Sequence, residues 1–518
     1  MEKIIETQVL VIGGGVTGTG IARDLCLRGF DVVLIEKKDL NAGASGGNHG
    51  LLHSGARYIA SDPEAAVECN SEIRILKKMA GHCIQRTGGL FVAVRGDDEN
   101  YIADFPGLCD RAGIPFEAVS VRDAIKLEPV LSANLIAAYQ VNDASINPFK
   151  ISIENMNDAV SRGARYLSFC KLESFDMEKK KIVRANVRNQ VNGKAFQIQA
   201  QTYINASGAW AGYIAQMADI SIPMVFSKGT LLVTSRRLAR HVINRLRKAT
   251  DADILVPGGV VSILGTTSLR VDHPDNIHPT VDEVDYIIDQ GAQMIPMLAT
   301  CRYVRAYSGV RPLVSAGGDD DRNVSRGYTL MDHERDGVDN FITITGGKLT
   351  TFRLMAEKTC DRVCEKLGVD AACQTEVIPL PATRSGEWSE PGIPHGGFKE
   401  FKASGDAILC ECEMVPASAI DSIINSICKD KGTPDLSSIA VRSRVGKGPC
   451  QGAFCSVRIL SHMYQTGQMS DTSGIQELKK FLNERWKGEH ALLWDQAIVQ
   501  SSIKEMIHCG VFGLELEK

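Results

Sequence analysis

The apolar positions near the start of the chain follow first a strand period and then a helix period. A short β-branched run, VLVI, precedes a glycine-rich turn; an amphipathic segment follows, and a second run, VVLI, comes next. Short apolar runs bounded by turn residues indicate strands, whereas apolar residues three and four apart indicate a helix. Residues 9–37 therefore predict a strand–helix–strand unit, and with it an α/β fold.

The turn of this unit has the spacing of a dinucleotide-binding motif. Gly13, Gly15 and Gly18 form G-x-G-x-x-G, and Glu36 closes the second strand. The first glycine permits a tight turn, the second lets a pyrophosphate approach the backbone, and the third lets the helix pack on the strand. The helix N-terminus offers N–H groups to phosphates, and a carboxylate at the position of Glu36 can accept hydrogen bonds from a ribose. We therefore expect a dinucleotide here.

Two further segments extend the nucleotide site. Residues 41–58, NAGASGGNHGLLHSGARY, are rich in small and polar residues, including Ser45 and Asn48, as expected of backbone that lines a long cofactor. Residues 204–210, INASGAW, indicate a strand that ends in small residues around Gly208. Both segments predict that the cofactor continues beyond the first unit.

A third segment has the same pattern later in the chain. Residues 341–367 predict a strand, a turn at Gly346 and Gly347, and a helix with one apolar face. The helix N-terminus would stabilise the electron-rich end of a reduced flavin. Because three such segments are spread over much of the chain, we favour FAD over NAD, and we assign the two glycines and Thr350 to cofactor binding.

Composition and charge narrow the class of protein. The chain has 518 residues, 44% hydrophobic and 23% charged, as is typical of a globular protein with more than one domain. A net charge of -4 argues against nucleic acid as a partner. The 15 cysteines show no disulfide framework, which favours a reducing cytoplasm. No apolar run approaches the ~18–20 residues that span a bilayer, and we expect no signal peptide.

Several stretches resemble FAD-dependent glycerol-3-phosphate dehydrogenases: HSGARY, GVRPLV and TGGKLTTFR, together with the first strand–helix–strand unit. The full layout, with paired cysteines late in the chain and FLNERWKG at residues 481–488, looks like the A subunit of the anaerobic, multi-subunit form. The resemblance implies a Rossmann-type FAD-binding domain interleaved with a mainly antiparallel β substrate domain, followed by a small iron–sulfur domain.

The resemblance also implies an activity. It predicts oxidation of sn-glycerol 3-phosphate to dihydroxyacetone phosphate by hydride transfer to FAD, with electrons sent through an iron–sulfur cluster and partner subunits to a quinone. A cytoplasmic protein, held peripherally at the inner face of the membrane by its partners, is the expected location. Two alternatives stay open: an FAD-dependent dehydrogenase or oxidase of 2-hydroxy acids or amino acids, and a non-catalytic electron-relay subunit.

A phosphate ester requires cationic groups, and three arginines lie in the stretches that carry the resemblance. Arg57 precedes Tyr58, Arg311 lies within apolar GVRPLV, and Arg353 follows the glycine turn. A guanidinium makes paired, charge-assisted hydrogen bonds to phosphate, although a solvated ion pair is the commoner role of a single arginine. We assign Arg57, Tyr58 and Arg353 to substrate binding and Arg311 to catalysis.

The hydroxyl group of such a substrate needs a general base. His53 is the candidate, because histidine titrates near neutral pH and the residue matches the family's motif. Lys348, in the glycine turn, is expected to stabilise the reduced flavin or to orient the substrate oxygen. Thr267, in LGTTSLR, matches another stretch near the family's active site. Single-subunit relatives carry a histidine where this chain has Leu231, which gives His53 more weight.

Four cysteines form two close pairs, Cys410-x-Cys412 and Cys450-x4-Cys455. Each pair is expected at a helix N-terminus, which would stabilise thiolates. The alternatives are disulfides, a zinc site and a [2Fe–2S] cluster; a reducing compartment disfavours the first, and zinc sites more often show C-x2-C spacing. We favour a [2Fe–2S] cluster held by four thiolates. The pattern also resembles the ferredoxin-like domain associated with bacterioferritin.

These features divide the chain into four segments. Residues 1–370 are the FAD-dependent oxidoreductase region, 371–407 a linker rich in Pro, Gly and Ser, 408–470 the [2Fe–2S]-binding domain, and 471–518 a helical tail. A basic stretch at residues 235–248 is expected to be a solvated face, or a surface for a partner subunit or anionic lipid.

Overall fold

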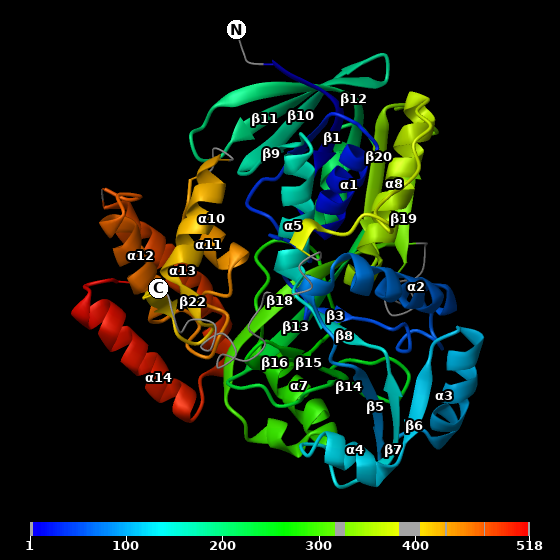
Figure 1. Ribbon diagram of the computed structural model, residues 1–518, viewed down its shortest axis with the longest axis vertical. Helices are drawn as coiled ribbons and strands as arrows, with labels where there is room; N and C mark the ends of the chain where they lie inside the picture. The colour runs from blue at the N-terminus through cyan, green and yellow to red at the C-terminus, as the bar shows by residue number, and fades with distance from the viewer. Residues whose placement is uncertain (1–3, 316–326, 383–404, 430–432, 471, 516–518) are drawn as a thin grey trace.

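The computed structural model describes residues 4–315, 327–382, 405–429, 433–470 and 472–515. Two large sheets build two lobes, which lie one above the other in Figure 1, and the C-terminal helices lie beside them. No helix in these described ranges is long and apolar enough to cross a membrane.

The first lobe is a largely parallel sheet. Its strands are β1 (Ile4–Ile12), β2 (Val32–Ile35), β9 (Arg165–Leu167), β10 (Cys170–Glu178), β11 (Lys181–Asn189), β12 (Ala195–Asn205), β19 (Tyr328–Asp332) and β20 (Phe341–Gly346). Strands β12, β1, β2 and β9 run parallel in that order, and β20 lies parallel to the C-terminal end of β12. The β10–β11 hairpin and β19 add antiparallel edges. The predicted Rossmann-type region is therefore present.

Helices cover both faces of this sheet, which explains why β1 is a continuous apolar run. Val9 and Val11 pack with three helices, α1 (Val16–Leu27), α5 (Pro148–Ser161) and α8 (Phe352–Leu367). Leu10 and Ile12 face the opposite side, where α6 (Ala211–Gln216) and the β10–β11 hairpin contribute apolar residues. Alternate residues of a strand point to opposite faces, so a strand buried on both sides has no polar alternation.

The second lobe is a mainly antiparallel sheet, as predicted. Its strands are β5 (Gly89–Val94), β6 (Phe116–Val119), β7 (Leu135–Val141), β13 (Met224–Thr234), β14 (Val242–Arg245), β15 (Ile254–Gly258), β16 (Val261–Gly265), β17 (Leu269–Val271) and β18 (Tyr303–Val314). Among the strand pairs that the structure describes in this sheet, only β14–β5 is parallel. Its helices are α3 (Glu99–Arg111), α4 (Val121–Leu127) and α7 (Val281–Met294). Between the lobes lie α2 (Pro63–Met79) and the small sheet of β3 (Leu51–Leu52), β8 (Ala144–Ile146) and β4 (Ile84–Gln85) (Figure 1).

The basic stretch 235–248 is not one solvated or docking face. It contains the buried strand β14, and Arg245 is only 4% exposed, with its guanidinium paired to Asp97 at 2.8 Å. Arg237 donates hydrogen bonds to the backbone at Ala239 and to the side chain of Gln85. The number of basic residues in the stretch predicted an exposed surface. The sequence did not indicate the ion pair of Arg245, because its partner Asp97 lies more than a hundred positions away.

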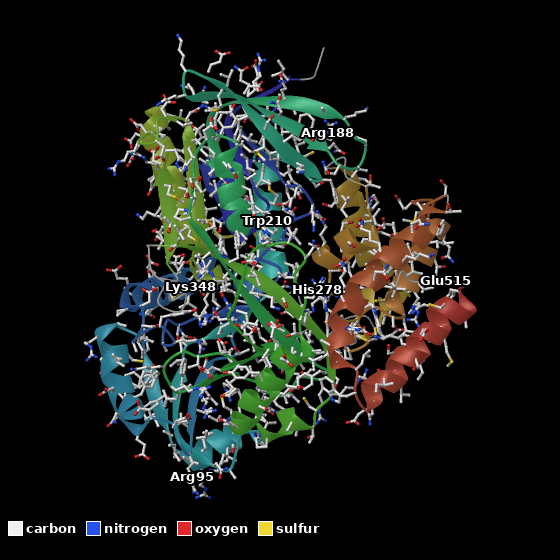
Figure 2. All side chains as sticks on the ribbon, turned by 180° about the vertical axis from the view of Figure 1, so that it is seen from behind. Arg95, Arg188, Trp210, His278, Lys348 and Glu515 are labelled. Carbon is white, nitrogen blue, oxygen red and sulfur yellow. The ribbon has the colours of Figure 1, made fainter. Side chains whose placement is uncertain are left out.

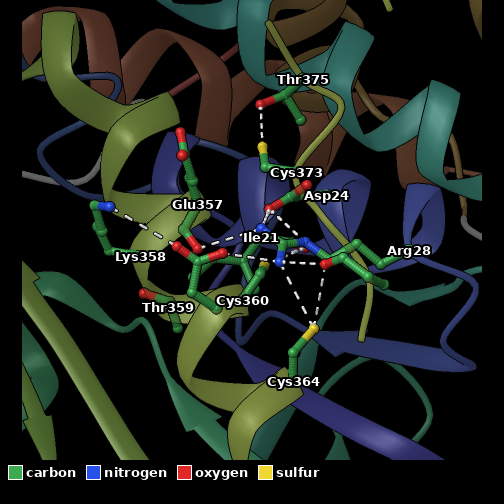
Figure 3. A network of polar contacts seen from close by, with 12 residues as sticks. Ile21, Asp24, Arg28, Glu357, Lys358, Thr359, Cys360, Cys364, Cys373 and Thr375 are labelled. Carbon is green, nitrogen blue, oxygen red and sulfur yellow. Dashed lines mark hydrogen bonds and ion pairs between the residues drawn. The ribbon is translucent and has the colours of Figure 1, made fainter. Parts of the chain in front are cut away.

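The start of the predicted linker packs on the first lobe. Arg28 donates to the carbonyl of Ala371 at 2.9 Å and pairs with Asp24 at 2.9 Å, and Figure 3 shows this network with Cys373 beside Thr375. Leu380 is 2% exposed and its N–H donates to the carbonyl of Met79. Residues 383–404 of the linker lie outside the described residues.

The C-terminal segments share one apolar core. Their elements are β21 (Ile408–Cys410), β22 (Val415–Pro416), α10 (Ala417–Lys429), α11 (Leu436–Arg442), α12 (Cys455–Gln465), α13 (Ser473–Glu489) and α14 (Gln496–Glu505). Leu478, Phe481 and Leu514 of the predicted tail pack in the same cluster as Ile420 and Ile459. We therefore treat residues 405–515 as one unit, the C-terminal module. Arg442 of this module pairs with Asp39 of the first lobe.

Candidate active site and thiol cluster

A cavity of about 420 Å³ between the two lobes contains most of the residues predicted from the sequence. Its wall includes Gly13, Gly15, Glu36, Ser45, Asn48, His53, Arg57, Tyr58, Gly208, Arg311, Gly346, Gly347 and Lys348. The carboxyl ends of β1, β2, β12 and β20 meet here, which is the edge where α/β sheets bind ligands. Figure 2 shows Trp210 and Lys348, both in this wall, between Arg188 and Arg95 at the far ends of the lobes.

The turn between β1 and α1 is packed so closely that it requires glycine. Gly13 has φ +119°, and a Cβ there would lie 2.5 Å from the carbonyl oxygen of Ala206. A Cβ at Gly18 would lie 1.9 Å from the carbonyl oxygen of Gly13. Gly18 therefore serves helix packing, as the motif predicts, and does not line the cavity.

Polar groups flank this turn. Glu36 accepts hydrogen bonds from the N–H groups of Gly14 at 2.8 Å and Lys38 at 2.9 Å, while burial raises the pKa of its carboxyl. The hydroxyl of Ser45 accepts a hydrogen bond from the N–H of Val16 at 2.9 Å, at the start of α1. Both side chains lie where the sequence places the dinucleotide.

Arg311 enters the cavity from β18 through a gap left by glycine. Its guanidinium donates to the carbonyl of Thr267 at 3.2 Å and to the hydroxyl of Ser227 at 3.3 Å, and it contacts Thr266. Gly229 on the neighbouring strand β13 leaves room for it, because a Cβ there would lie 2.7 Å from Nη2. The backbone thus fixes the direction of this cation.

Arg57 offers a donor that the described residues do not use. Its Nη2 donates to the carbonyl of Thr250 at 2.7 Å and to the carboxylate of Asp253 at 3.2 Å. Its Nη1 is buried and has no hydrogen-bond partner among the described residues. A buried guanidinium nitrogen is costly without an acceptor, so an acidic ligand group in this cavity would stabilise it.

His53, Tyr58 and Lys348 form one contact group. The Nε2 atom of His53 lies 3.3 Å from the hydroxyl of Tyr58, and the Nζ atom of Lys348 lies 4.6 Å from the centre of the Tyr58 ring. The N–H of His53 donates to the hydroxyl of Thr350 at 3.0 Å. Thr350 therefore holds the backbone of His53 in place, and it does not itself line the cavity.

His49 is a cavity residue that the sequence reasoning missed. It lies four positions before His53, and the two ring centres are 6.1 Å apart. Burial, and then the positive charges of Arg311 and Arg57, lower the pKa of His49 to about 3. Its Nδ1 accepts a hydrogen bond from the N–H of Leu51. The only sequence signal was a second histidine in the small-residue segment. Leu231 also lines the cavity.

Two predicted substrate ligands lie outside the cavity wall. The guanidinium of Arg353 is occupied by Glu72 at 2.6 Å and Glu357 at 2.6 Å, which tie α8 to α2 and to the next turn of α8. The hydroxyl of Thr267 donates to Glu283 at 2.9 Å, and its neighbour Thr266 lines the cavity instead. Each side chain therefore donates to a buried carboxylate on another element, Arg353 to Glu72 and Thr267 to Glu283.

The four predicted cysteines converge in the C-terminal module. Cys410 ends β21 and Cys412 follows in the turn before β22, so this pair lies in a hairpin and not at a helix N-terminus; Cys455 begins α12, as predicted. A Cβ at Gly448 would lie 2.6 Å from the Cβ of Cys412, so glycine lets the two loops approach each other.

Sulfur-to-sulfur hydrogen bonds connect the four thiols. Hydrogen bonds from Cys412 and Cys455 lower the pKa of Cys450, and a hydrogen bond from Cys455 lowers the pKa of Cys410. The same contacts raise the pKa values of Cys412 and Cys455. In the described ranges no group of three or more His, Cys, Asp and Glu side chains has the arrangement of a metal-ion site. The potential metal ligands are therefore four sulfur atoms that lie together and contact one another as thiols.

Comparisons with known proteins agree with this geometry. The chain matches the family described as FAD dependent oxidoreductase over residues 8–362. It is 41% identical to the A subunit of anaerobic glycerol-3-phosphate dehydrogenase of Escherichia coli (strain K12), over 99% of this chain and 98% of that protein. It is 37% identical to the A1 subunit of anaerobic glycerol-3-phosphate dehydrogenase of Haloferax volcanii, over 98% of this chain and 90% of that protein.

A solved structure shows the same fold. The glycerol-3-phosphate dehydrogenase from Bacillus halodurans, complexed with FAD, superposes with a TM-score of 0.67 at 21% identity, covering 95% of this chain and 96% of that chain. This chain belongs to the FAD dependent oxidoreductase family. Within it, the full-length similarity is to the A subunits of anaerobic glycerol-3-phosphate dehydrogenases, and FAD is the cofactor that the family and the cavity support.

Proposed function

We propose that this protein oxidises sn-glycerol 3-phosphate to dihydroxyacetone phosphate with FAD as the electron acceptor. The observation that carries the proposal is the buried Nη1 of Arg57, which has no acceptor among the described residues, in a cavity that Arg311 and Lys348 also line. A phosphate dianion needs several cationic donors, whereas one carboxylate needs fewer. The full-length similarity to proteins named for glycerol 3-phosphate supports this substrate over an amino acid or a 2-hydroxy acid.

The side chains of the cavity have separate roles in this reaction. Arg57 and Arg311 hold the phosphate, and Lys348 orients the secondary alcohol oxygen as its bond to carbon becomes a carbonyl. The hydroxyl proton passes to Nε2 of His53, which the Thr350 hydroxyl and Tyr58 hold in place. FAD, when bound, would supply the hydride acceptor for the same carbon. The hydride and the hydroxyl proton together account for the two hydrogens and two electrons that the substrate loses.

We further propose that Cys410, Cys412, Cys450 and Cys455 hold a [2Fe–2S] cluster, which would supply one-electron transfer. The support is the chemistry of the donor set: four thiols from two loops lie in hydrogen-bond contact with one another, and thiolates are the ligands of such a cluster. A zinc ion is the alternative occupant. The contacts between the sulfurs require the loops to adjust to either one.

Partner subunits, and a quinone reached through them at the inner face of the membrane, complete the proposal. Two observations support partners. The relatives are named as subunits, and the C-terminal module exposes several large apolar side chains: Phe454, Ile498, Val499, Met506, Val511 and Phe512. His508 ties the segment after α14 to the thiol loop, with Nε2 3.1 Å from the carbonyl oxygen of Ala453.

Anaerobic reduction of the bound flavin tests the proposed substrate. Glycerol 3-phosphate should bleach the flavin absorbance in a single turnover, whereas equal concentrations of glycerol, L-proline and L-2-hydroxyglutarate should not. Bleaching by L-proline or the hydroxy acid alone would instead assign the alternative substrate class. An unreduced flavin with all four compounds would indicate an electron-relay role.

A further inference from the structure

A second cavity, of about 320 Å³, lies where the C-terminal module meets both lobes. One side is formed by the loop of Asn48 and His49, which also lines the first cavity. The opposite side is formed by α11, α13 and the thiol loop at Gln451. Helix α13 packs on β18, as Figure 1 shows, so the cavity is closed by elements that are distant in the sequence. Its volume falls in the range of small-molecule sites.

Two of the arginines in this wall lack a counter-charge within the described part of the chain. Arg305 projects from β18 and Arg485 from α13, and neither forms an ion pair among the described residues. The Nε atom of Arg305 is buried without a hydrogen-bond partner there. Burial first, and then repulsion from Arg305, lowers the pKa of Arg485 to about 9. Like charges held close together without an anion destabilise the site.

The nearby carboxylates do not neutralise these arginines, because each already has a lysine partner. Glu484 pairs with Lys487 at 2.5 Å, and Glu489 pairs with Lys504 at 2.6 Å. Both act on Arg305 and Arg485 only from beyond ion-pair distance, and the thiol of Cys455 raises the pKa of Arg485 without forming an ion pair with it. The cavity therefore carries an excess of positive charge.

The other two cations of the wall differ from these. Arg444 is paired with Glu413 at 2.8 Å. The Nζ atom of Lys447 lies 4.0 Å from the centre of the Phe149 ring and donates to the carbonyl of Ser443. They shape one end of the cavity. Arg305 and Arg485 also lie over aromatic rings, 5.7 Å from the centre of Tyr307 and 4.8 Å from the centre of Phe481, but neither has an ion-pair partner among the described residues.

We propose that this cavity binds a small organic anion, with its phosphate or carboxylate group between Arg305 and Arg485 and its apolar body against Phe481, Val261 and Ile263. A planar guanidinium makes charge-assisted hydrogen bonds to either acidic group. The apolar wall excludes a fully hydrated inorganic ion as the best ligand. Such a ligand would touch both lobes and the C-terminal module, and would hold them together at the loop between the two cavities.

Binding of 1-anilinonaphthalene-8-sulfonate to the full-length, FAD-loaded protein tests the proposal, because this dye combines an acidic group with apolar rings. We expect one site per chain, with displacement by phenyl phosphate or benzoate at lower concentration than by inorganic phosphate or sodium chloride. If phenyl phosphate displaces the dye more effectively than benzoate, the acidic group of the ligand is a phosphate; if benzoate is more effective, it is a carboxylate. Arg305→Gln and Arg485→Gln should each weaken dye binding at least tenfold. Arg188→Gln, at an exposed pair with Glu173, is the charge-matched control and should change nothing.

A cavity-filling variant keeps the test decisive if an arginine variant misfolds. Val441→Trp leaves all charges in place and should abolish dye binding, while FAD content and the thermal midpoint report the fold. Unchanged dye binding in Val441→Trp, or displacement by sodium chloride as effective as by phenyl phosphate, would overturn the proposal. Flavin reduction by glycerol 3-phosphate is measured in parallel, and the anion site does not depend on its outcome.

Discussion

Gly229 leaves the space that the guanidinium of Arg311 occupies. The two residues lie on adjacent antiparallel strands, β13 and β18, and a Cβ at Gly229 would lie 2.7 Å from Nη2 of Arg311. Ser227, the register partner of Arg311, accepts one of its hydrogen bonds from the same strand. Arg311 is the proposed ligand of the substrate phosphate. The direction of its guanidinium is therefore set by the absence of a side chain at Gly229.

Replacing Gly229 by alanine should displace Arg311 without removing its charge. We expect the KM for glycerol 3-phosphate to rise and kcat/KM to fall, because a charged hydrogen bond to phosphate is lost or distorted. The corresponding loss of transition-state stabilisation is about 1–3 kcal/mol. Steady-state kinetics measure both. Gly107→Ala is the control, since a Cβ there meets only Arg111 at 3.6 Å. An unchanged KM in Gly229→Ala, with a raised KM in Arg311→Ala, would show that the gap is unnecessary.

Replacing His53 by alanine should slow flavin reduction while FAD stays bound. Removal of a general base costs a factor of about 100 to 10,000, and stopped-flow absorbance measures the rate directly. Tyr58→Phe is the matched control, because it removes only the hydroxyl 3.3 Å from Nε2 and should cost much less. If the His53 variant reduces flavin at the parent rate, the base lies elsewhere in the cavity, and His49 is the next residue to replace.

His49 should make the protein sensitive to acid. Its pKa falls from 6.5 to about 3 on folding, mainly through burial, so the unfolded chain binds a proton between these values that the folded chain does not. Unfolding then takes up a proton, and the free energy of unfolding decreases as pH falls below about 6.5. His49→Gln should therefore lose about 1–2 kcal/mol less stability between pH 7 and pH 5 than the parent. Denaturant unfolding at the two pH values measures this; equal losses would contradict a histidine that stays neutral in the folded chain.

The local motifs were predictable because each depends on neighbours in the sequence. The glycine turn at Gly13 and the strand before Gly346 follow from apolar period and turn chemistry, and the comparisons confirm the FAD-binding fold. Arg353 shows the limit of this reasoning. It follows the glycine turn as a substrate ligand would, but its partner Glu72 comes from α2, and no local pattern predicts that ion pair.

Residues on two loops that meet only in the folded chain were harder to predict. The thiol pairs were visible from their spacing, but the hairpin that carries Cys410 and Cys412 was not, because the apolar run before it is too short to distinguish from a helix start. Arg305 and Arg485 lie near each other only because β18 packs against α13 in the folded chain. A sequence pattern cannot show that their carboxylate neighbours are already paired.

Replacing Cys450 by serine should remove the iron from the C-terminal module while glycerol 3-phosphate still reduces the flavin. Cys450 is in hydrogen-bond contact with both Cys412 and Cys455, and a serine oxygen is a poor substitute for a thiolate bound to iron. Iron and acid-labile sulfide should fall from about two of each per chain to near zero, and the paramagnetic resonance signal after reduction should disappear. Cys428→Ser, at an exposed cysteine on α10, is the control and should keep both. Zinc without sulfide in the parent protein, purified without oxygen, would rule out the cluster and leave the four thiols a structural role.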